Sequence, residues 1–437
     1  MTMDRREMLL SLGGIAAARA FGFGDDLEAA ADRSADRIDA RPAERARMPA
    51  RGAPFPRKDD FTIEPGYTYL NAAYTHPIPK VAVQAARYAA EWRGAMRKPS
   101  PGGMRLLTPR ELFAQIINAK ATEIAHVSST SAGENLVVHA LGLHHDFSGN
   151  VVTDGLHFEG SIMHLLELKK RGLDVRVVQP TADARIDMRD LERAVDGETR
   201  LIEVSAAAMY NGFQHNLKAV ADLAHAHGAC VYADIVHAAG AEPFDVKATG
   251  IDFASCSSFK WLMGDFGLGF LYAREDVLGT IERPVVGYYQ ADDIEANYPP
   301  NLPPGPYVPV TYTFNQGAQR MFETGSLTGS VEVNVALLRA SLNYVLSLGV
   351  ANIQVHRLPL IRRLQQEMPR LGFTPVTPSE STGGNVTFAR TNVGTSDVPK
   401  KLLAAKVNVR VAKHWLRVSP SVYNDMKDIE RLLEALS

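Results

Sequence analysis

The stretch His227-Gly-Ala-Cys-Val-Tyr-Ala-Asp-Ile-Val-His237 places a short apolar run directly before an aspartate. A helical pattern ends at Gly228, so the run predicts a buried strand that ends at Asp234. A carboxylate at the end of an apolar strand is costly unless a cation pairs with it. An ordinary helix N-cap is the alternative interpretation of this aspartate.

Strand and helix patterns alternate on both sides of this stretch. Further strands are predicted at 149–153, 175–179, 201–205, 251–256 and 269–273, with helices at 161–171 and 217–227. Such alternation predicts an α/β fold with a mostly parallel, helix-covered sheet. Two long helical patterns at 331–348 and 353–371 are followed by strands at 384–388 and 409–418 and a helix at 425–436. We therefore expect a large domain over 61–330 and a smaller C-terminal α+β domain over 331–437.

The composition excludes several classes of protein. The 437 residues include 46% hydrophobic and 22% charged residues, which is ordinary for a globular protein. The net charge of −2 gives no reason to expect nucleic acid or an anionic membrane as partner. Two cysteines are too few for a disulfide framework or a thiolate zinc site. The size favours an enzyme without indicating which one.

The N-terminus carries a pattern of its own. Arg5 and Arg6 precede a short apolar run over 8–18, and Ala18-Arg19-Ala20 offers a small-x-small cleavage site. This resembles a twin-arginine export signal, although a frayed basic helix would also fit. The run is too short for a stable membrane insertion. We expect a signal over 1–20, the twin-arginine translocation machinery as partner, a periplasmic location, and an Ala/Arg/Asp/Pro-rich linker over 21–60.

Two further polar features follow predicted strands. Lys260 lies among Phe259, Trp261 and other apolar residues, and such surroundings lower a lysine pKa and favour Schiff-base chemistry. Ser128-Ser129-Thr130-Ser131 precedes a helical pattern, where hydroxyls and backbone N–H groups suit a phosphate. Parallel sheets bind ligands at the carboxyl ends of their strands. A phosphate cup, a strand-end aspartate and a lysine together match the needs of pyridoxal 5′-phosphate.

From about Tyr69 onward the chain resembles the class V aminotransferase family of fold type I pyridoxal-phosphate enzymes. The motifs that carry the resemblance are Tyr69-Leu-Asn-Ala-Ala73, Ser129-Thr-Ser-Ala-Gly-Glu-Asn-Leu136, Asn211-Gly-Phe, the stretch 227–237, Ser257-Ser-Phe-Lys260, Phe322-Glu-Thr-Gly-Ser326 and Leu416-Arg-Val-Ser-Pro-Ser-Val-Tyr-Asn424. They occur in family order. The resemblance therefore implies a fold type I transferase with pyridoxal 5′-phosphate as cofactor.

The resemblance also implies catalytic roles. Lys260 would form the Schiff base with the cofactor and then move the proton at the substrate α-carbon. Asp234 would pair with the pyridine nitrogen and make the ring an electron sink. His157 takes the position of the residue that stacks on the ring, and His237 would hydrogen-bond the 3-oxygen.

The remaining implied roles concern the phosphate and the substrate. The phosphate would be held by Thr130, Ser131 and Ser257, with Ser326 reaching the phosphate of a neighbouring subunit in a homodimer. The substrate carboxylate would be bound by Arg417, whose guanidinium suits that duty. Asn71 and Asn211 are further candidates for the substrate pocket. We expect no metal site, since the spacing of His139, His144 and His145 matches no standard ligand set.

One departure from the family's motifs bears on which reaction the protein can catalyse. Cysteine desulfurases of this family need a nucleophilic cysteine on a loop shortly before the carboxylate arginine, and none occurs between Gly372 and Arg417. Cys230 and Cys256 fall in predicted core strands. Unless the loop is misaligned, desulfurase activity by that route is excluded.

The sequence thus predicts an exported pyridoxal-phosphate enzyme that acts at the amino-bearing carbon of an amino acid or peptide-linked amino acid. Aminotransferase and epimerase both fit, and Asn211-Gly-Phe with the pair Asp234 and His237 resembles the branch of isopenicillin N epimerase and exported pyoverdine-tailoring enzymes. A C–S or β-eliminating lyase without a catalytic cysteine is one alternative. A non-catalytic, cofactor-binding accessory protein of siderophore maturation is another.

Overall fold

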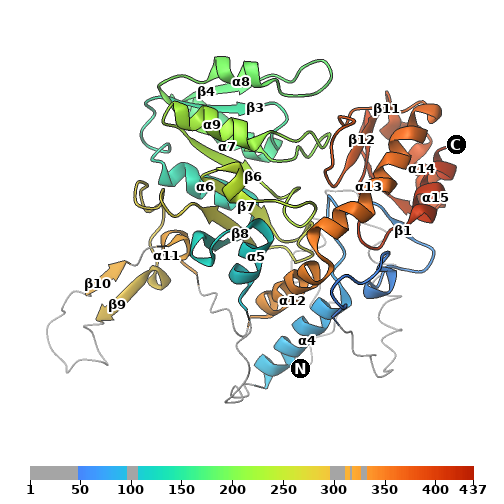
Figure 1. The fold of residues 1–437 in the computed structure, drawn as a ribbon, viewed down its shortest axis with the longest axis horizontal. Helices are drawn as coiled ribbons and strands as arrows, with labels where there is room; N and C mark the ends of the chain where they lie inside the picture. Colours follow the sequence, from blue (N-terminus) through green and yellow to red (C-terminus); the bar gives the residue numbers. More distant parts are fainter. Residues whose placement is uncertain (1–47, 96–106, 296–310, 315–316, 326–331) are drawn as a thin grey trace, which may run out of the picture. The chain divides into compact units, whose positions relative to one another are not determined.

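A seven-stranded sheet forms the centre of the computed structural model, which describes residues 48–95, 107–295, 311–314, 317–325 and 332–437 (Figure 1). In spatial order its strands are β2 (Ile124–Val127), β8 (Gly269–Ala273), β7 (Phe253–Ser257), β6 (Cys230–Asp234), β5 (Thr199–Ser205), β3 (Asn150–Asp154) and β4 (Asp174–Val178). Strand β8 runs antiparallel to β2 and β7, and every other adjacent pair in this sheet is parallel. The predicted mostly parallel α/β fold is confirmed.

Helices cover both faces of this sheet because its strands alternate apolar side chains from face to face. Tyr232 and Leu201 pack in one cluster with α6 (Thr130–Ala140) and α7 (Glu159–Lys170). Val231 and Ile202 pack on the opposite face, against the helices α5 (Pro109–Ile117), α8 (Met188–Ala194), α9 (Leu217–Ala226) and α12 (Val333–Leu348). Both faces of the central strands are therefore buried.

A second, smaller sheet lies in the C-terminal region. It is antiparallel, in the order β11 (Thr374–Pro375), β12 (Val386–Ala389), β15 (Trp415–Val418) and β14 (Arg410–Val411). Its core includes apolar residues of α13 (Val350–Glu367), α14 (Val398–Ala404) and α15 (Met426–Leu436). The single strand predicted over 409–418 is wrong, because the chain turns at the polar Lys413-His414 and Ala412 N–H donates to the carbonyl of Trp415 at 2.9 Å.

N-terminal segments join the two regions. Strand β1 (Thr68–Tyr69) pairs in parallel with β13 (Val407–Asn408), and α4 (Lys80–Gly94) packs against α12. The end of the predicted linker also contacts the body, since the Tyr344 hydroxyl donates to Asp60 at 2.8 Å. The described residues from Met48 onward form one compact unit, and the division predicted at 330/331 stays a prediction.

The remaining elements are short. They are the helices α10 (Val246–Thr249) and α11 (Ala318–Phe322), the antiparallel pair β9 (Ala291–Glu295) and β10 (Thr311–Phe314), and the 3-10 turns η1 (Lys58–Asp60), η2 (Ala121–Glu123), η3 (Tyr288–Gln290), η4 (Met368–Leu371) and η5 (Val393–Thr395). The predicted signal, most of the linker and Ser326 lie outside the described residues.

Among the described helices, none is by itself long and apolar enough to cross a membrane. Residues 333–348 and 350–371 pass that test only when taken together, and they are bent by 72° at the break between them.

Candidate active site

A small cavity of about 160 Å³ opens where β6 and β7 end and α6 begins. It is lined by Ser129, Thr130, Ser131, Phe158, Met209, Asp234, Val236, His237, Ser257, Phe259 and Lys260. This place is the carboxyl edge of a parallel sheet, where such folds bind their ligands. Six of the lining residues were proposed from the sequence: Thr130, Ser131, Asp234, His237, Ser257 and Lys260.

Lys260 lines this cavity beside His237. Its Nζ donates to Nε2 of His237 at 3.0 Å. Burial lowers the pKa of Lys260 to about 8, against the opposing charge of Asp234. Burial, and then the charge of Lys260, hold the pKa of His237 well below its ordinary value. His237 is therefore a neutral acceptor, and Lys260 can exist as a free amine near neutral pH.

The lysine should make the stability of the cofactor-free protein depend on pH. The native pKa is about 8 against an ordinary 10.5, so between these values the unfolded chain binds more protons and stability rises with pH. Below pH 8 the lysine is charged in both the folded and the unfolded protein. The burial of this charge then lowers the free energy of unfolding by its full amount, about 3 kcal/mol for this shift. A Lys260→Met variant should therefore exceed the wild type in free energy of unfolding most strongly below pH 8, with the difference shrinking toward pH 10.5. Denaturant titrations across this range measure it, and a difference that does not vary with pH would contradict the buried lysine.

Asp234 ends β6 as the sequence predicts. Its Oδ1 accepts a hydrogen bond from the Val236 N–H at 2.8 Å, which is the local, cap-like bond of the alternative interpretation. Burial raises its pKa, while the charges of Lys260 and His157 oppose that rise. A cationic ring nitrogen would keep this carboxylate ionised, so its surroundings suit the role that the resemblance implies.

The residues predicted to hold the phosphate lie where α6 begins and where β7 ends. Ser129 caps α6, because its hydroxyl accepts the Ala132 N–H at 3.1 Å. Thr130 N–H donates to the Ser257 hydroxyl at 2.8 Å, and Ser257 N–H donates to the Thr130 hydroxyl at 3.0 Å. These bonds join the start of α6 to the end of β7. With Ser131, they place hydroxyls and a helix N-terminus at the cavity, as an anion site requires.

Gly133 explains how α6 can lie so close to β7. A Cβ atom at this position would collide with the side chain of Ser255. The glycine therefore lets the N-terminus of α6 approach the strand that ends at Ser257.

His157 is held from both sides. Its Nδ1 lies 2.8 Å from the Ser205 hydroxyl, and its Nε2 donates to Glu134 at 2.9 Å. Burial lowers the pKa of His157, but the bond to Glu134 and the acidic charges around it raise it by more. The ring is therefore fixed next to Phe158, which lines the cavity; its stacking on the cofactor stays a prediction.

The sequence did not single out the acidic partners of this histidine. Burial raises the pKa of Glu134, but the hydrogen bond and the charge of His157 lower it by more, to about 2, so this carboxyl group is ionised. Glu203 has a pKa well above its ordinary value because of burial and the charge of Glu134. A glutamate inside the apolar strand 201–205 was a signal of the same kind as Asp234, and it could have been found the same way.

Arg417 lies on β15 and is 2% exposed. Its Nη1 donates to the carbonyl of Met209 at 2.8 Å, and its Nε has no hydrogen-bond partner among the described residues. Burial, and then the charge of Arg410, lower its pKa to about 10. Its charge also acts on Lys260 and His237. A buried guanidinium near the cavity, with no carboxylate of the described chain paired to it, suits an anionic substrate group.

The two asparagines have structural partners. Asn71 Nδ2 donates to Asn408 at 3.1 Å, while its Oδ1 has no partner in the described part of the chain. Asn211 Nδ2 donates to the Ala184 carbonyl at 2.7 Å and its Oδ1 accepts the Phe213 N–H at 3.0 Å. Their contacts with substrate, and the homodimer inferred from Ser326, stay predictions.

Neither cysteine is a candidate nucleophile. Cys230 begins β6, at the opposite end from Asp234, and burial raises its pKa to about 12. Cys256 is buried within β7, and burial raises the pKa of its thiol as well. Both thiols are therefore protonated, and a thiol attacks as the thiolate.

Comparison with known proteins identifies the chain. Residues 68–432 match the aminotransferase class-V family. The chain belongs to this family. As a class V enzyme it uses pyridoxal 5′-phosphate, and a solved structure of the same fold, a variant of C-DES, holds glycine covalently linked to that cofactor.

Individual relatives of this class V enzyme carry sulfur-related names. A probable cysteine desulfurase from Methanothermobacter thermautotrophicus is 28% identical over 401 residues, which cover 86% of this chain and 96% of the relative. The apo structure of cysteine desulfurase from Thermococcus onnurineus NA1 shares the fold at a TM-score of 0.72 and 22% identity, covering 87% of this chain and 97% of its own. A complex of the cystine C–S lyase C-DES with its product cysteine persulfide does so at 0.70 and 20%, covering 85% and 97%.

These relatives correct the sequence-based function. The predicted activity, that of an exported aminotransferase or epimerase, is wrong, because cysteine desulfurases and a cystine C–S lyase are among the proteins that match most of this chain. The sequence motifs concern the cofactor, which the whole family shares. They therefore identified the cofactor and the fold, but not the bond that is broken.

The residues present fit the cofactor. Thr130, Ser131 and Ser257 offer hydroxyls at a helix N-terminus, and Asp234 is a buried carboxylate without an arginine partner in the described structure. His237 Nδ1 is buried and has no hydrogen-bond partner among the described residues. A phosphorylated aromatic aldehyde would satisfy this donor set, with Lys260 as the amine that binds it.

Proposed function

We propose that this class V enzyme breaks the C–S bond of cysteine or cystine and releases the sulfur with the departing fragment. The observation that carries the proposal is the absence of a cysteine from a site that otherwise holds a reactive lysine and an unpaired arginine. The names of the relatives support the substrate class. Without a thiolate, the sulfur has no acceptor on the described protein.

Three side chains carry the proposed reaction. When bound, pyridoxal 5′-phosphate supplies an electron sink for the α-carbon. Arg417 binds the substrate carboxylate and orients the α-carbon toward Lys260. The Lys260 amine removes the α-proton, since its lowered pKa makes it a base near neutral pH. His237, neutral and 3.0 Å away, holds Nζ in place.

The products follow from the bond that breaks. Cleavage of the Cβ–S bond of cystine, with addition of one water, gives cysteine persulfide, pyruvate and ammonia. Cysteine itself would give hydrogen sulfide, pyruvate and ammonia. No oxidant or reductant is needed in either case.

Removing the cysteines tests the proposal. The double variant Cys230→Ala/Cys256→Ala should keep at least about half of the wild-type release of sulfur from cystine, because neither thiol takes part. The measurement is sulfide released after reduction of the products, on protein whose fold is checked by circular dichroism. Loss of all activity in a folded double variant, restored by returning one cysteine, would show that a protein thiol accepts the sulfur and would overturn the proposal.

We further propose that residues 1–20 direct export by the twin-arginine route to the periplasm. The pair Arg5-Arg6, the short apolar run and the small-x-small site support it. Changing both arginines to lysine should leave the full-length protein in the cytoplasm while the wild type reaches the periplasm, as measured by cell fractionation and immunoblot. Unchanged export of the double-lysine variant would contradict this signal.

A further inference from the structure

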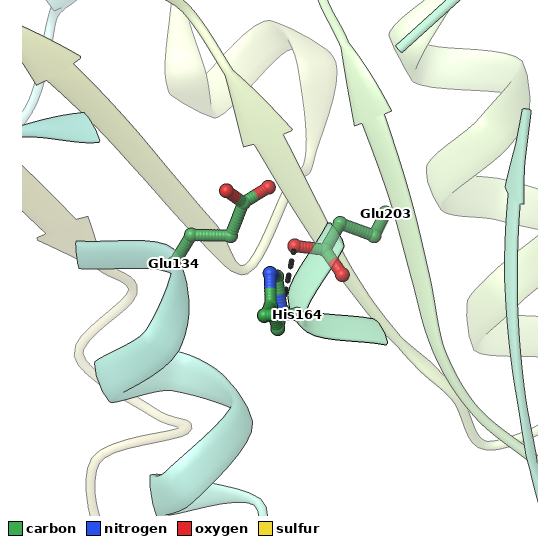
Figure 2. Close-up of side chains that lie close together, drawn as sticks. All are labelled: Glu134, His164 and Glu203. Atoms are coloured by element: carbon green, nitrogen blue, oxygen red, sulfur yellow. Dashed lines mark ion pairs between the residues drawn. The ribbon is translucent and has the colours of Figure 1, made fainter. Parts of the chain in front are cut away.

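Glu134, His164 and Glu203 lie close together in the structure (Figure 2). Glu134 comes from α6, His164 from α7 and Glu203 from β5. Each offers one ligand atom, and these atoms all lie within 4.8 Å of one another. His164 Nε2 is 3.7 Å from Glu203 Oε1. The two glutamate side chains are fully buried and the histidine is 14% exposed, so bulk water hardly reaches the group.

Most polar atoms of this group have no hydrogen-bond partner. Within the described chain this holds for both oxygens of Glu203, for Oε2 of Glu134 and for both ring nitrogens of His164. Figure 2 shows the Glu203 carboxylate directed toward His164, with the Glu134 carboxylate beside it. Buried polar atoms are nearly always satisfied in native proteins, and leaving one unsatisfied costs about 1–3 kcal/mol. Five such atoms in one place indicate an occupant that bonds to several of them.

The surrounding hydroxyls give an observation that is independent of the acidic pair. Thr153 and Tyr232 are the register partners of Glu203 on the two adjacent strands, so the three side chains share one face of the sheet. Ser161 lies three residues before His164 on α7, and therefore on the same helix face. All three hydroxyls are fully buried and have no hydrogen-bond partner in the described residues. The polar region thus extends beyond the three side chains.

The charge of this group and the types of its ligand atoms indicate which kind of occupant it would bind. Two fully buried carboxylates lie close together, and among the described residues their only ion-pair partners are His157 and His164. A shared proton would satisfy one bond, whereas a divalent cation would satisfy all three side chains at once. Two carboxylates with one imidazole suit zinc and similar transition metals, whereas calcium takes six to eight oxygens.

We propose that Glu134, His164 and Glu203 bind a divalent transition-metal ion of the zinc type, with a fourth position for water. The metal would link α6, α7 and β5, which carry these three side chains. Glu134 would bind it through Oε2, while its Oε1 accepts the 2.9 Å bond from His157. The metal is therefore a structural element that fixes the carboxylate which positions His157. This site is independent of the C–S chemistry proposed above.

Zinc binding to the holoenzyme tests the site directly. Because His139, His144 and His145 contact one another at the surface and could bind zinc, every protein carries His144→Ala/His145→Ala. After dialysis against chelator, zinc is returned, and retained metal is measured by mass spectrometry and equilibrium dialysis. The background protein should bind about one zinc per chain. Glu203→Gln and His164→Gln should each lower the affinity at least about tenfold, and Glu198→Gln, an exposed glutamate just before β5, should not change it.

Crystals of the holoenzyme provide a measurement that needs no variant in the cluster. An anomalous difference peak at the zinc edge is expected between the three side chains. No bound zinc, a peak elsewhere, or an affinity that Glu203→Gln leaves unchanged would overturn the metal site and favour a proton shared by Glu134 and Glu203 or trapped water. Each of these outcomes is separate from sulfur release, so failure of the metal site leaves the proposed function untouched.

Discussion

A Lys260→Ala variant is expected to lose at least about 10³-fold in kcat/KM for sulfur release, because it lacks both the amine that binds the cofactor and the base at the α-carbon. The purified variant should also lose the yellow colour of the wild type after dialysis. In the wild type, borohydride should fix the cofactor to Lys260, and peptide mass spectrometry identifies the modified residue. Steady-state kinetics with cystine measures the loss.

The matched control for this variant is Lys247→Ala. Lys247 lies exposed on α10, outside the cavity, so its removal should change neither colour nor rate. Folding of Lys260→Ala is expected, since alanine removes a buried charge rather than creating one. If the folded variant keeps near wild-type turnover, or if borohydride marks another lysine, the assignment of Lys260 is wrong.

Replacing Arg417 by methionine should raise KM for cystine at least about tenfold, the value of a lost charge-assisted bond to the carboxylate, with a smaller effect on kcat. Methionine fills similar space, and the described structure pairs no carboxylate with Arg417 that would be left uncompensated. Substrate titrations of the two proteins give the ratio.

Two comparisons make the Arg417 prediction specific. Lys413→Met, at an exposed residue in the turn of the same small sheet, should leave KM unchanged. Cystamine, which is cystine without its carboxylates, should bind the wild type and Arg417→Met about equally in a competition assay. An equal loss of affinity for cystine and cystamine would mean that Arg417 does not bind the carboxylate.

The parts of the fold that depend on local patterns could be predicted from the sequence. The strand that ends at Asp234, the alternation around it and the order of the cofactor motifs all follow from apolar runs, glycine stops and polar strand ends. The turn at 412–414 was missed because the strand-like residues on both sides of the polar Lys413-His414 were assigned to one strand. The pairing of β1 with β13 joins residues more than three hundred positions apart, and no local signal encodes it.

Some residues of the candidate site could likewise be predicted from the sequence, and others could not. Residues that meet the cofactor follow strand ends, so Asp234, Ser257 and Lys260 could be predicted to lie together. Glu203 could have been singled out as a carboxylate inside an apolar strand, but its closeness to Glu134 could not be predicted, because tertiary packing brings the two buried side chains together. Two cysteines in core strands were correctly placed by hydrophobicity alone. The bond that the enzyme breaks depends on substrate geometry, and the family motifs do not carry that information.

The products formed from cystine distinguish C–S cleavage from desulfuration and from transamination. The purified holoenzyme is incubated with L-cystine, and pyruvate, ammonia, persulfide sulfur and alanine are quantified in one reaction. Cleavage of the Cβ–S bond should give equal amounts of pyruvate, ammonia and cysteine persulfide, with no alanine. Alanine as the product would show removal of sulfur alone, and a keto acid that retains its sulfur would show transamination; either result would contradict C–S cleavage with the sulfur leaving on the substrate fragment.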